Sequence, residues 1–307
     1  MKKEQVIKVS NLKDYRKYLL AILLFFNDFC EKNGIDYSLS DGTLLGAVRE
    51  KNFIPWDDDI DVVMTRDNWR IFKECFEKYN GRYALEFLPK TSIKRKRKKD
   101  FLCLHPRLVD KKCNSQRYNI DIQLIDYLGD DIDIAYYAVE KSKKFQKYSA
   151  IGPTFHILPL KKSNSFLENV RNVLINFIFP ITFLIHLFYT PIFLKKYDRF
   201  EKKYLLHGSA SKYYTVEPYL GRFGVSDESL IKNGYAKVEF AKLSFPAFSN
   251  YHHYLKKTYG DYMTPPPENM QKAYHTFLEY ERFIIEMDDE LKHYLSLIPT
   301  DALSKFE

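Results

Sequence analysis

Four aspartates at the start of a β-branched run constrain this chain more than any other feature. They stand in residues 56–64, which read WDDDIDVVM. Alternate residues of a strand point to the same face, so Asp59 and Asp61 project together while Ile60 and Val62 enter the core. Two adjacent carboxylates repel each other unless a cation lies between them, and Mg²⁺ commonly takes one or two carboxylates together with phosphate and water oxygens. The segment is therefore a candidate divalent-cation site, although an acidic triplet on its own is more often a solvated turn.

The residues before the acidic segment favour the metal-site interpretation. Residues 35–40 alternate as a strand does, and residues 41–49 (DGTLLGAVR) read as a tight turn that opens a helix. A strand, a Gly-Thr turn, a helix and a strand that begins with Asp-Ile-Asp follow one another in an order that resembles nucleotidyltransferases of the DNA polymerase β type. In that family the glycine turn holds the nucleotide phosphates, and the carboxylate pair holds the metal ions.

Three motifs make the resemblance more specific. Residues 42–49 followed by residues 53–61 (FIPWDDDID) resemble the signature of the LicD family, the cholinephosphotransferases related to fukutin and fukutin-related protein. Residues 120–126 (IDIQLID) are similar to that family's Asp-Ile-Phe-Pro-Leu-Asp segment, with glutamine and leucine in place of the usual aromatic residue and proline. Residues 259–266 (YGDYMTPP) resemble its C-terminal Tyr-Gly-Asp box.

The resemblance implies a phosphotransferase that has the nucleotidyltransferase fold but breaks the other bond of the nucleotide. Phosphocholine, or a related phospho-alcohol, would move from CDP-choline or another CDP-alcohol donor to a sugar hydroxyl of a lipid-linked surface polysaccharide or teichoic acid precursor, and CMP would leave. In-line displacement at phosphorus depends mainly on positioning and charge neutralisation. Two alternatives stay open, namely true nucleotidyl transfer with release of pyrophosphate, and a membrane-docked nucleic-acid-binding or scaffold protein.

Three carboxylates are predicted to be catalytic and to bind the metal, which the resemblance implies is Mg²⁺, with Mn²⁺ as the alternative ion. Asp59 and Asp61 are two of them. We expect the third to be Asp121, because in residues 118–122 it lies on the opposite face from two isoleucines. Asp121 could instead be the general base for the acceptor hydroxyl, a role that the sequence cannot separate from metal binding. Asp126, expected at a strand end or in a turn, is the alternative third ligand.

Five further residues are predicted to bind the substrate. Gly42 and Thr43 form the turn that would hold the donor phosphates, near the point where the three carboxylates are expected to converge. Arg49, about two helical turns further on, could reach a phosphate or could be an exposed helix-end arginine. Trp56 could stack on the base or simply pack, and packing is favoured. Arg107 lies where the family has a basic residue that faces the nucleotide, and the histidine two residues before it is a weaker candidate.

Two segments indicate contact with a membrane surface. A run of six basic residues at 94–99 accounts for most of the net charge of +8. No aromatic interleaving or helix-turn-helix pattern accompanies it, so we expect no nucleic-acid partner. Residues 173–194 form 22 consecutive residues without a charged side chain, and one helix of that length would reach roughly 33 Å. A single span would separate two parts of one catalytic domain, and Pro180 would kink it. We therefore expect a broken helical hairpin or a pair of short helices in one leaflet, with Phe193 among the exposed side chains. The alternative is a buried core helix.

The expected location is the cytoplasmic face of the membrane, as a peripheral or monotopic protein. The four cysteines show no CxxC spacing, and the N-terminal residues lead into a charged amphipathic helix, not an apolar signal core. Both features are typical of a protein in the reducing cytosol, where a CDP-activated donor is also found. A lipid-linked saccharide acceptor would meet such a protein at the membrane surface.

The predicted fold class is α+β, a nucleotidyltransferase-type small mixed sheet with flanking helices and a helical, membrane-facing insertion. With 307 residues, 45% of them hydrophobic, the chain can bury one substantial core and a smaller appendage. We divide it into a catalytic core at 1–130, a helical insertion at 131–240, and C-terminal helices at 241–307 that complete the catalytic domain. Helices are expected to dominate after residue 131. The predicted helices are 11–32, 67–79 (capped by Asp67), 251–257 and 269–297, and the predicted strands lie near 35–39, 60–64, 83–88, 101–109 and 119–125.

Overall fold

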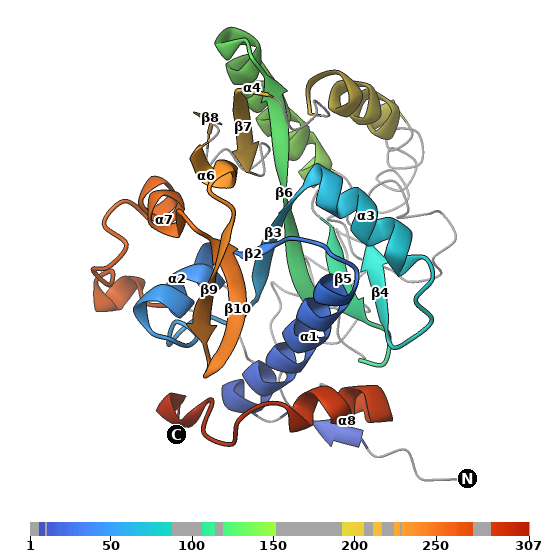
Figure 1. Ribbon diagram of the computed structural model, residues 1–307, viewed down its shortest axis with the longest axis vertical. Coiled ribbons are helices and arrows are strands. Elements are labelled where there is room, and N and C mark those ends of the chain that lie inside the picture. The colour runs from blue at the N-terminus through green and yellow to red at the C-terminus, as the bar shows by residue number, and fades with distance from the viewer. Residues whose placement is uncertain are drawn as a thin grey trace, which may run out of the picture.

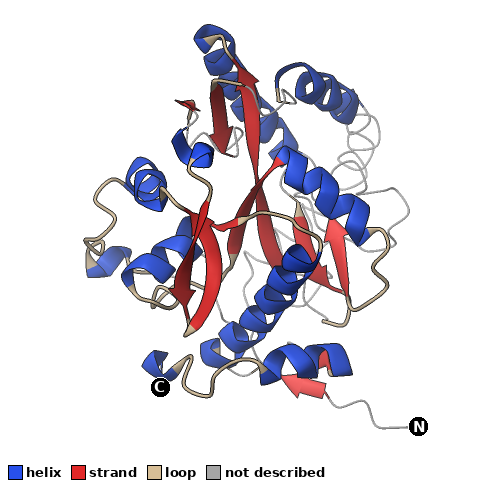
Figure 2. Ribbon diagram, viewed as in Figure 1, coloured by secondary structure: helices blue, strands red, loops and turns tan. Residues whose placement is uncertain are grey.

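The structure is a computed structural model that describes residues 6–9, 11–87, 106–113, 119–151, 192–205, 211–216, 224–227, 229–272 and 284–306. Within these ranges the chain forms a seven-stranded mixed sheet with flanking helices (Figures 1 and 2). The predicted α+β class, with a mixed sheet and flanking helices, is confirmed. The strands of the sheet are β2 (Ser38–Leu39), β3 (Asp61–Thr65), β4 (Tyr83–Glu86), β5 (Arg107–Asp110), β6 (Asn119–Gly129), β7 (Tyr213–Val216) and β8 (Ser226–Asp227).

The long strand β6 organises this sheet. It runs parallel to β3 on one side, and on its other side it pairs antiparallel with β5 along its first half and with β7 along its second half. Strand β2 lies antiparallel to β3, β4 to β5, and β8 to β7. Because β3 and β6 are interior strands, their apolar residues Val62, Met64 and Ile122 are fully buried.

Helix α1 (Leu12–Lys32) forms as predicted and packs beside α3 (Arg66–Phe76) on β6, in front of the sheet in Figure 1. The side chain of Asn11 caps α1 by accepting a hydrogen bond from the backbone N–H of Asp14. Aromatic rings join the two helices, with Phe26 and Phe29 of α1 each 5.2 Å from the ring of Phe72. This aromatic layer covers one face of the sheet.

Helix α2 (Asp41–Arg49) follows β2 directly, as the glycine turn predicts, and it lies beside β3 at the β2 edge of the sheet. The hairpin of β9 (Tyr235–Phe240) and β10 (Leu243–Phe248) and the helix α7 (Tyr251–Tyr259) pack around it (Figure 1). Other described elements are β1 (Val6–Lys8), α4 (Ile132–Ile151), α6 (Ser229–Lys232), η1 (Glu268–Met270), β11 (Ile284–Glu286), α8 (Asp289–Ser296) and η3 (Ser304–Phe306).

After residue 131, helices still hold more of the described residues than strands do, but the sequence did not predict the strands that lie among them. Strand β7 joins the central sheet, β9 and β10 form a hairpin, and β11 pairs with β1 inside the range predicted as one helix at 269–297. The sequence did not predict the β9–β10 hairpin, because its two left-handed turn positions are occupied by Ala241 and Lys242, with φ of 51° and 60°. Such turns usually carry Gly, Asn or Asp, which are the residues that mark a hairpin in a sequence.

The apolar segment 173–194 lies outside the described residues except for its last three positions. Those positions open a described helix at residues 192–204, in which Phe193 is only 3% exposed and packs against Phe145, with ring centroids 5.8 Å apart. The expected exposure of Phe193 is therefore wrong. No helix within the described part of the chain is long and apolar enough to cross a membrane. The basic run at 94–99 also lies outside the described residues, and the three-part division of the chain stays a prediction.

The cap of α3 also differs from its prediction. Thr65, in extended conformation at the end of β3, accepts a hydrogen bond from the backbone N–H of Asn68, whereas Asp67 lies within the first turn of the helix. The helix starts one residue earlier than predicted because the strand residue itself provides the cap.

Replacing Thr65 by Ala should therefore cost about 1 kcal/mol in the free energy of unfolding, because the cap is lost. Asp67→Ala should cost only a few tenths of a kcal/mol, since it removes the attraction to the helix dipole and an exposed ion pair with Arg70 at 3.9 Å. Urea denaturation of both variants measures the difference, and Thr65→Ser is the control that keeps the hydroxyl. A larger loss for Asp67→Ala would contradict this assignment of the cap.

Candidate active site

A buried arginine fixes the loop that carries the acidic residues. Arg16 of α1 is 0% exposed, and its Nη2 donates to the backbone carbonyls of Ile54, Pro55 and Asp57 at 2.8, 2.9 and 2.6 Å. Its Nε donates to the same Asp57 carbonyl at 3.1 Å, and its guanidinium lies over the ring of Phe53, 5.1 Å from the centroid. A planar fork of donors suits this arrangement of carbonyls. The loop before β3 is thus held from inside the core.

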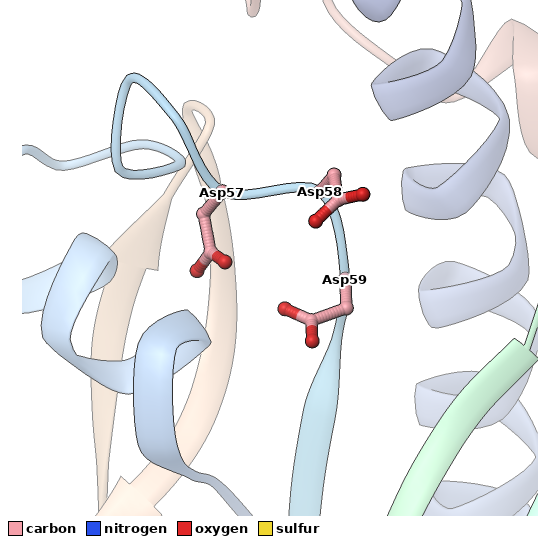
Figure 3. A group of neighbouring side chains, drawn as sticks. All are labelled: Asp57, Asp58 and Asp59. Atoms are coloured by element: carbon pink, nitrogen blue, oxygen red, sulfur yellow. The ribbon is translucent and has the colours of Figure 1, made fainter. Parts of the chain in front are cut away.

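The loop brings three carboxylates together. Oxygens of Asp57, Asp58 and Asp59 all lie within 4.8 Å of one another, close enough to hold one cation. In Figure 3 the side chains of Asp57 and Asp59 lie on the same side of the loop with their carboxylates facing one another. Burial, together with the nearby Asp59 carboxylate, raises the pKa of Asp57 well above its usual range. A divalent cation would relieve the repulsion that causes part of this rise.

The absence of a side chain at Gly42 leaves space for the Asp57 carboxylate. A Cβ atom at position 42 would come within 2.3 Å of the Asp57 Oδ2 atom, so no larger side chain fits without displacing Asp57. The N-terminal turn of α2 therefore touches the acidic loop directly. The predicted glycine turn and the predicted acidic segment form one site.

The parallel pairing of β3 and β6 brings Asp61 and Asp121 together. They are register partners, and the Asp61 backbone N–H donates to Thr43 Oγ1 at 2.9 Å. Arg107 of β5 is the antiparallel register partner of Asp121, and its Nε lies 2.8 Å from the Asp121 carboxylate. Both side chains of this ion pair are about one quarter exposed, at 29% and 25%. Asp61, Thr43, Asp121 and Arg107 thus form a continuous polar strip across four elements.

The structure therefore places the predicted carboxylates in two adjoining groups. Asp59 belongs with Asp57 and Asp58, whereas Asp61 lies beside Asp121 in the sheet. In the described part of the chain, the three residues 57–59 are the group whose oxygens approach within 4.8 Å, so Asp61 and Asp121 do not join it in this arrangement. The assignment of Asp59, Asp61 and Asp121 as metal ligands stays a prediction.

Comparisons with known proteins agree on a family for this chain. Residues 34–125 match the family model described as the LicD/FKTN/FKRP nucleotidyltransferase domain. The lipopolysaccharide cholinephosphotransferase LicD of Haemophilus influenzae is 30% identical over 276 residues, which is 88% of this chain and 97% of that protein. The chain belongs to the LicD family. An uncharacterised protein of Rickettsia typhi is 34% identical over 76 residues, which is 23% of this chain and 25% of that protein.

Two other residues predicted to bind substrate have partners within this LicD-family protein. The side chain of Arg49 is 7% exposed, and it bonds Glu50 at 2.8 Å and the backbone carbonyl of Tyr262 at 3.2 Å. It therefore links the end of α2 to the Tyr-Gly-Asp box and is not the exposed helix-end arginine of the alternative interpretation. Trp56 is partly buried and packs against the main core, in agreement with the favoured interpretation.

Asp126 is neither a turn residue nor part of this site. It lies inside β6, is 1% exposed, and forms an ion pair with Arg66 at the start of α3. Burial raises its pKa to about 6, while Arg66 opposes the rise. The expected strand-end position is wrong because β6 continues past residue 125 to pair with β7.

Sequence reasoning missed Arg16 and the particular importance of Asp57. Arg16 occupies a position on α1 where helical periodicity alone allows either a core residue or an exposed one. The run of three aspartates pointed to Asp57 only as one member of an acidic turn. What distinguishes Asp57 is its close approach to Gly42, which leaves no space for a side chain at position 42. The sequence does not reveal that contact.

Replacing Asp57 by Asn should stabilise the metal-free protein at pH 8 by about 2–4 °C in melting temperature. The pKa of Asp57 is higher in the folded state than its ordinary value of 3.8, so ionising Asp57 costs stability as the pH rises above 3.8. The gain of the variant should therefore shrink toward zero as the pH falls to 4. Thermal melts with EDTA across this pH range measure it, and a gain that is larger at pH 4 would contradict the raised pKa.

Replacing Arg16 by Met should lower the free energy of unfolding by about 3 kcal/mol, because several buried carbonyls lose a charged donor at once. Arg70 is exposed on α3, with a side-chain exposure of 68%, so Arg70→Met is the matched control and should change stability by less than about 0.5 kcal/mol. Guanidinium denaturation compares them. Equal effects of the two substitutions would show that Arg16 does not hold the loop.

Proposed function

We propose that this LicD-family protein transfers phosphocholine, or a closely related phospho-alcohol, from its CDP-activated form to a sugar hydroxyl and releases CMP. The observation that carries the proposal is the 30% identity to a lipopolysaccharide cholinephosphotransferase over 97% of that protein. The described site supports it, because the glycine turn, the acidic loop and the Asp61 and Asp121 pair adjoin one another. Phosphoethanolamine, glycerol phosphate and ribitol phosphate are the other cargoes that this chemistry allows.

In the proposed reaction an oxygen of the acceptor hydroxyl attacks the phosphorus that carries the alcohol. A new P–O bond forms, the bond to the bridging oxygen of CMP breaks, and the hydroxyl proton leaves to a base. General base is the alternative role for Asp121 if it does not bind the metal, and its ion pair with Arg107 keeps its carboxylate oriented on the sheet. We also propose that Arg107 balances negative charge on the donor, and the 29% exposure of its side chain beside Asp121 supports this role.

The carboxylates of the site fit a hard divalent cation, for which we propose Mg²⁺ or Mn²⁺. Three oxygen donors lie within 4.8 Å, and burial together with the Asp59 carboxylate raises the pKa of Asp57. We propose Asp59, Asp61 and Asp121 as ligands, with Asp57 as a further donor beside Asp59. When bound, the ion would neutralise charge that develops on the phosphate oxygens. Gly42 and Thr43 are proposed to hold the donor phosphate at the N-terminus of α2.

We propose a lipid-linked surface polysaccharide or teichoic acid precursor as the acceptor, met at the cytoplasmic face of the membrane. The support comes from the basic run at 94–99 and the apolar segment 173–194, which are features of the sequence. The free thiols Cys30, Cys75 and Cys113 also suit a reducing compartment. A peripheral or monotopic attachment would place the acidic loop near the sugar of a lipid-linked acceptor.

The test is to incubate the purified protein with CDP-choline, Mg²⁺ and an acceptor saccharide and to measure released CMP. We expect release to stop with EDTA and to fall at least about a hundredfold in Asp61→Asn, since charge stabilisation supplies much of the catalysis. Asp198→Asn, at an exposed aspartate that pairs with Lys202, is the control and should keep full activity. Release of pyrophosphate from CTP in place of CMP from CDP-alcohols would overturn this proposal in favour of nucleotidyl transfer.

A further inference from the structure

Asp41, the first residue of α2, has an unusual backbone and an anchored side chain. Its φ is 40°, a left-handed conformation that L-residues other than Asn and Asp rarely adopt. The preceding Ser40 makes no side-chain capping hydrogen bond, so the usual device for fixing a helix start is missing there. The Asp41 carboxylate is held instead, since Oδ2 accepts from Gln123 Nε2 at 2.7 Å and Oδ1 accepts from the Tyr254 hydroxyl at 2.9 Å.

Gln123 is a buried polar residue of the sheet whose side-chain amide donates to Asp41. It is 3% exposed and lies on β6 two residues after Asp121, so both side chains belong to the same face. A carboxylate can only accept hydrogen bonds, so the amide must turn its Nε2 toward Asp41. The Oε1 atom then has no hydrogen-bond partner among the described residues. The bond to Asp41 is therefore what accounts for a polar amide in this part of the interior.

Tyr254 is the second residue that donates a hydrogen bond to the Asp41 carboxylate. It belongs to α7, is 1% exposed, and its hydroxyl both donates to the Asp41 carboxylate and accepts from the Asp41 backbone N–H at 3.3 Å. Burial and the nearby Asp41 carboxylate raise the pKa of Tyr254, so the hydroxyl keeps its proton and remains a donor. Strand β6 and helix α7 thus hold one carboxylate from two sides.

We propose that Gln123 and Tyr254 are positioning residues for the reaction, acting through Asp41. They hold the first turn of α2 so that Gly42 stays against Asp57 and Thr43 stays bonded to Asp61. The donor phosphate that this turn would bind is thereby oriented toward the acidic loop and Asp121. The inference rests on the proposed function, and it concerns a position where the chain has glutamine in place of the aromatic residue usual in the family.

Two single substitutions test the positioning role. Gln123→Glu removes the amide donor and puts a second carboxyl group at hydrogen-bond distance from Asp41, where the two repel when both are ionised, and Tyr254→Phe removes the other donor. We expect kcat for CMP release to fall about tenfold or more in each, because small misplacements of reacting groups are costly. The KM for CDP-choline should stay within about threefold, since the remaining donor contacts persist. The matched control Tyr294→Phe, which removes a phenol bond to Asp28 outside the site, should keep the wild-type kcat.

A donor-acceptor exchange separates positioning from simple loss of folding. In the double variant Asp41→Asn/Gln123→Glu, the new amide can donate to the new carboxylate and still accept from Tyr254, so the contact is restored with its direction reversed. We expect its kcat to exceed that of Gln123→Glu at least about fivefold, with melting temperatures measured in parallel. A double variant no faster than Gln123→Glu would overturn the inference, as would an undiminished kcat in both single variants.

The same experiment distinguishes this inference from the proposed function. If the wild-type protein releases no CMP from CDP-alcohols, the proposed function fails and the inference fails with it. If the wild type is active and the variants keep its kcat, only the inference fails. A fall in kcat that is rescued by the exchange supports both.

Discussion

The candidate site depends on one buried cation, the guanidinium of Arg16. Its donors bind the backbone carbonyls of Ile54, Pro55 and Asp57, which fixes the backbone that leads into β3. Without such an anchor, repulsion among Asp57, Asp58 and Asp59 would favour an open, solvated loop. The other groups of the site keep their arrangement only while this loop stays in place.

Strand β6 serves both the fold and the site because its two faces and two halves differ. Its first half carries Asp121 and Gln123, which meet Arg107 and Asp41 on the face of the site. Its second half carries Asp126, whose buried ion pair with Arg66 ties the sheet to α3. Alternation along a strand sends neighbouring side chains to opposite faces, so one strand can combine a polar site with an apolar core. This explains why two aspartates five residues apart have unrelated roles.

Helix α2 is tied to the rest of the site at both ends. Its first turn touches Asp57 through Gly42, bonds the Asp61 backbone through Thr43, and is anchored through Asp41. Its last turn is tied to the Tyr-Gly-Asp box through Arg49 and the carbonyl of Tyr262. Two segments that both match family motifs, and that are more than 200 residues apart in the chain, therefore meet on one short helix. A rigid helix held at both ends can present backbone N–H groups to a phosphate without reorganising.

Local patterns in the sequence were enough to predict several regular elements and the residue types of the site. Periodicity predicted α1, α2, β3 and β6, and the acidic segment, the glycine turn and Asp121 were recognisable from their spacing and family resemblance. The tertiary structure alone decided which groups meet: Arg16 with the loop carbonyls, Gly42 with Asp57, Gln123 and Tyr254 with Asp41, and Arg49 with Tyr262. It also decided the β9–β10 hairpin, whose turn lacks the usual residues. The physical reason is the same in each case, because local backbone preferences depend on neighbours in the chain, whereas these contacts join residues that only the folded core brings together.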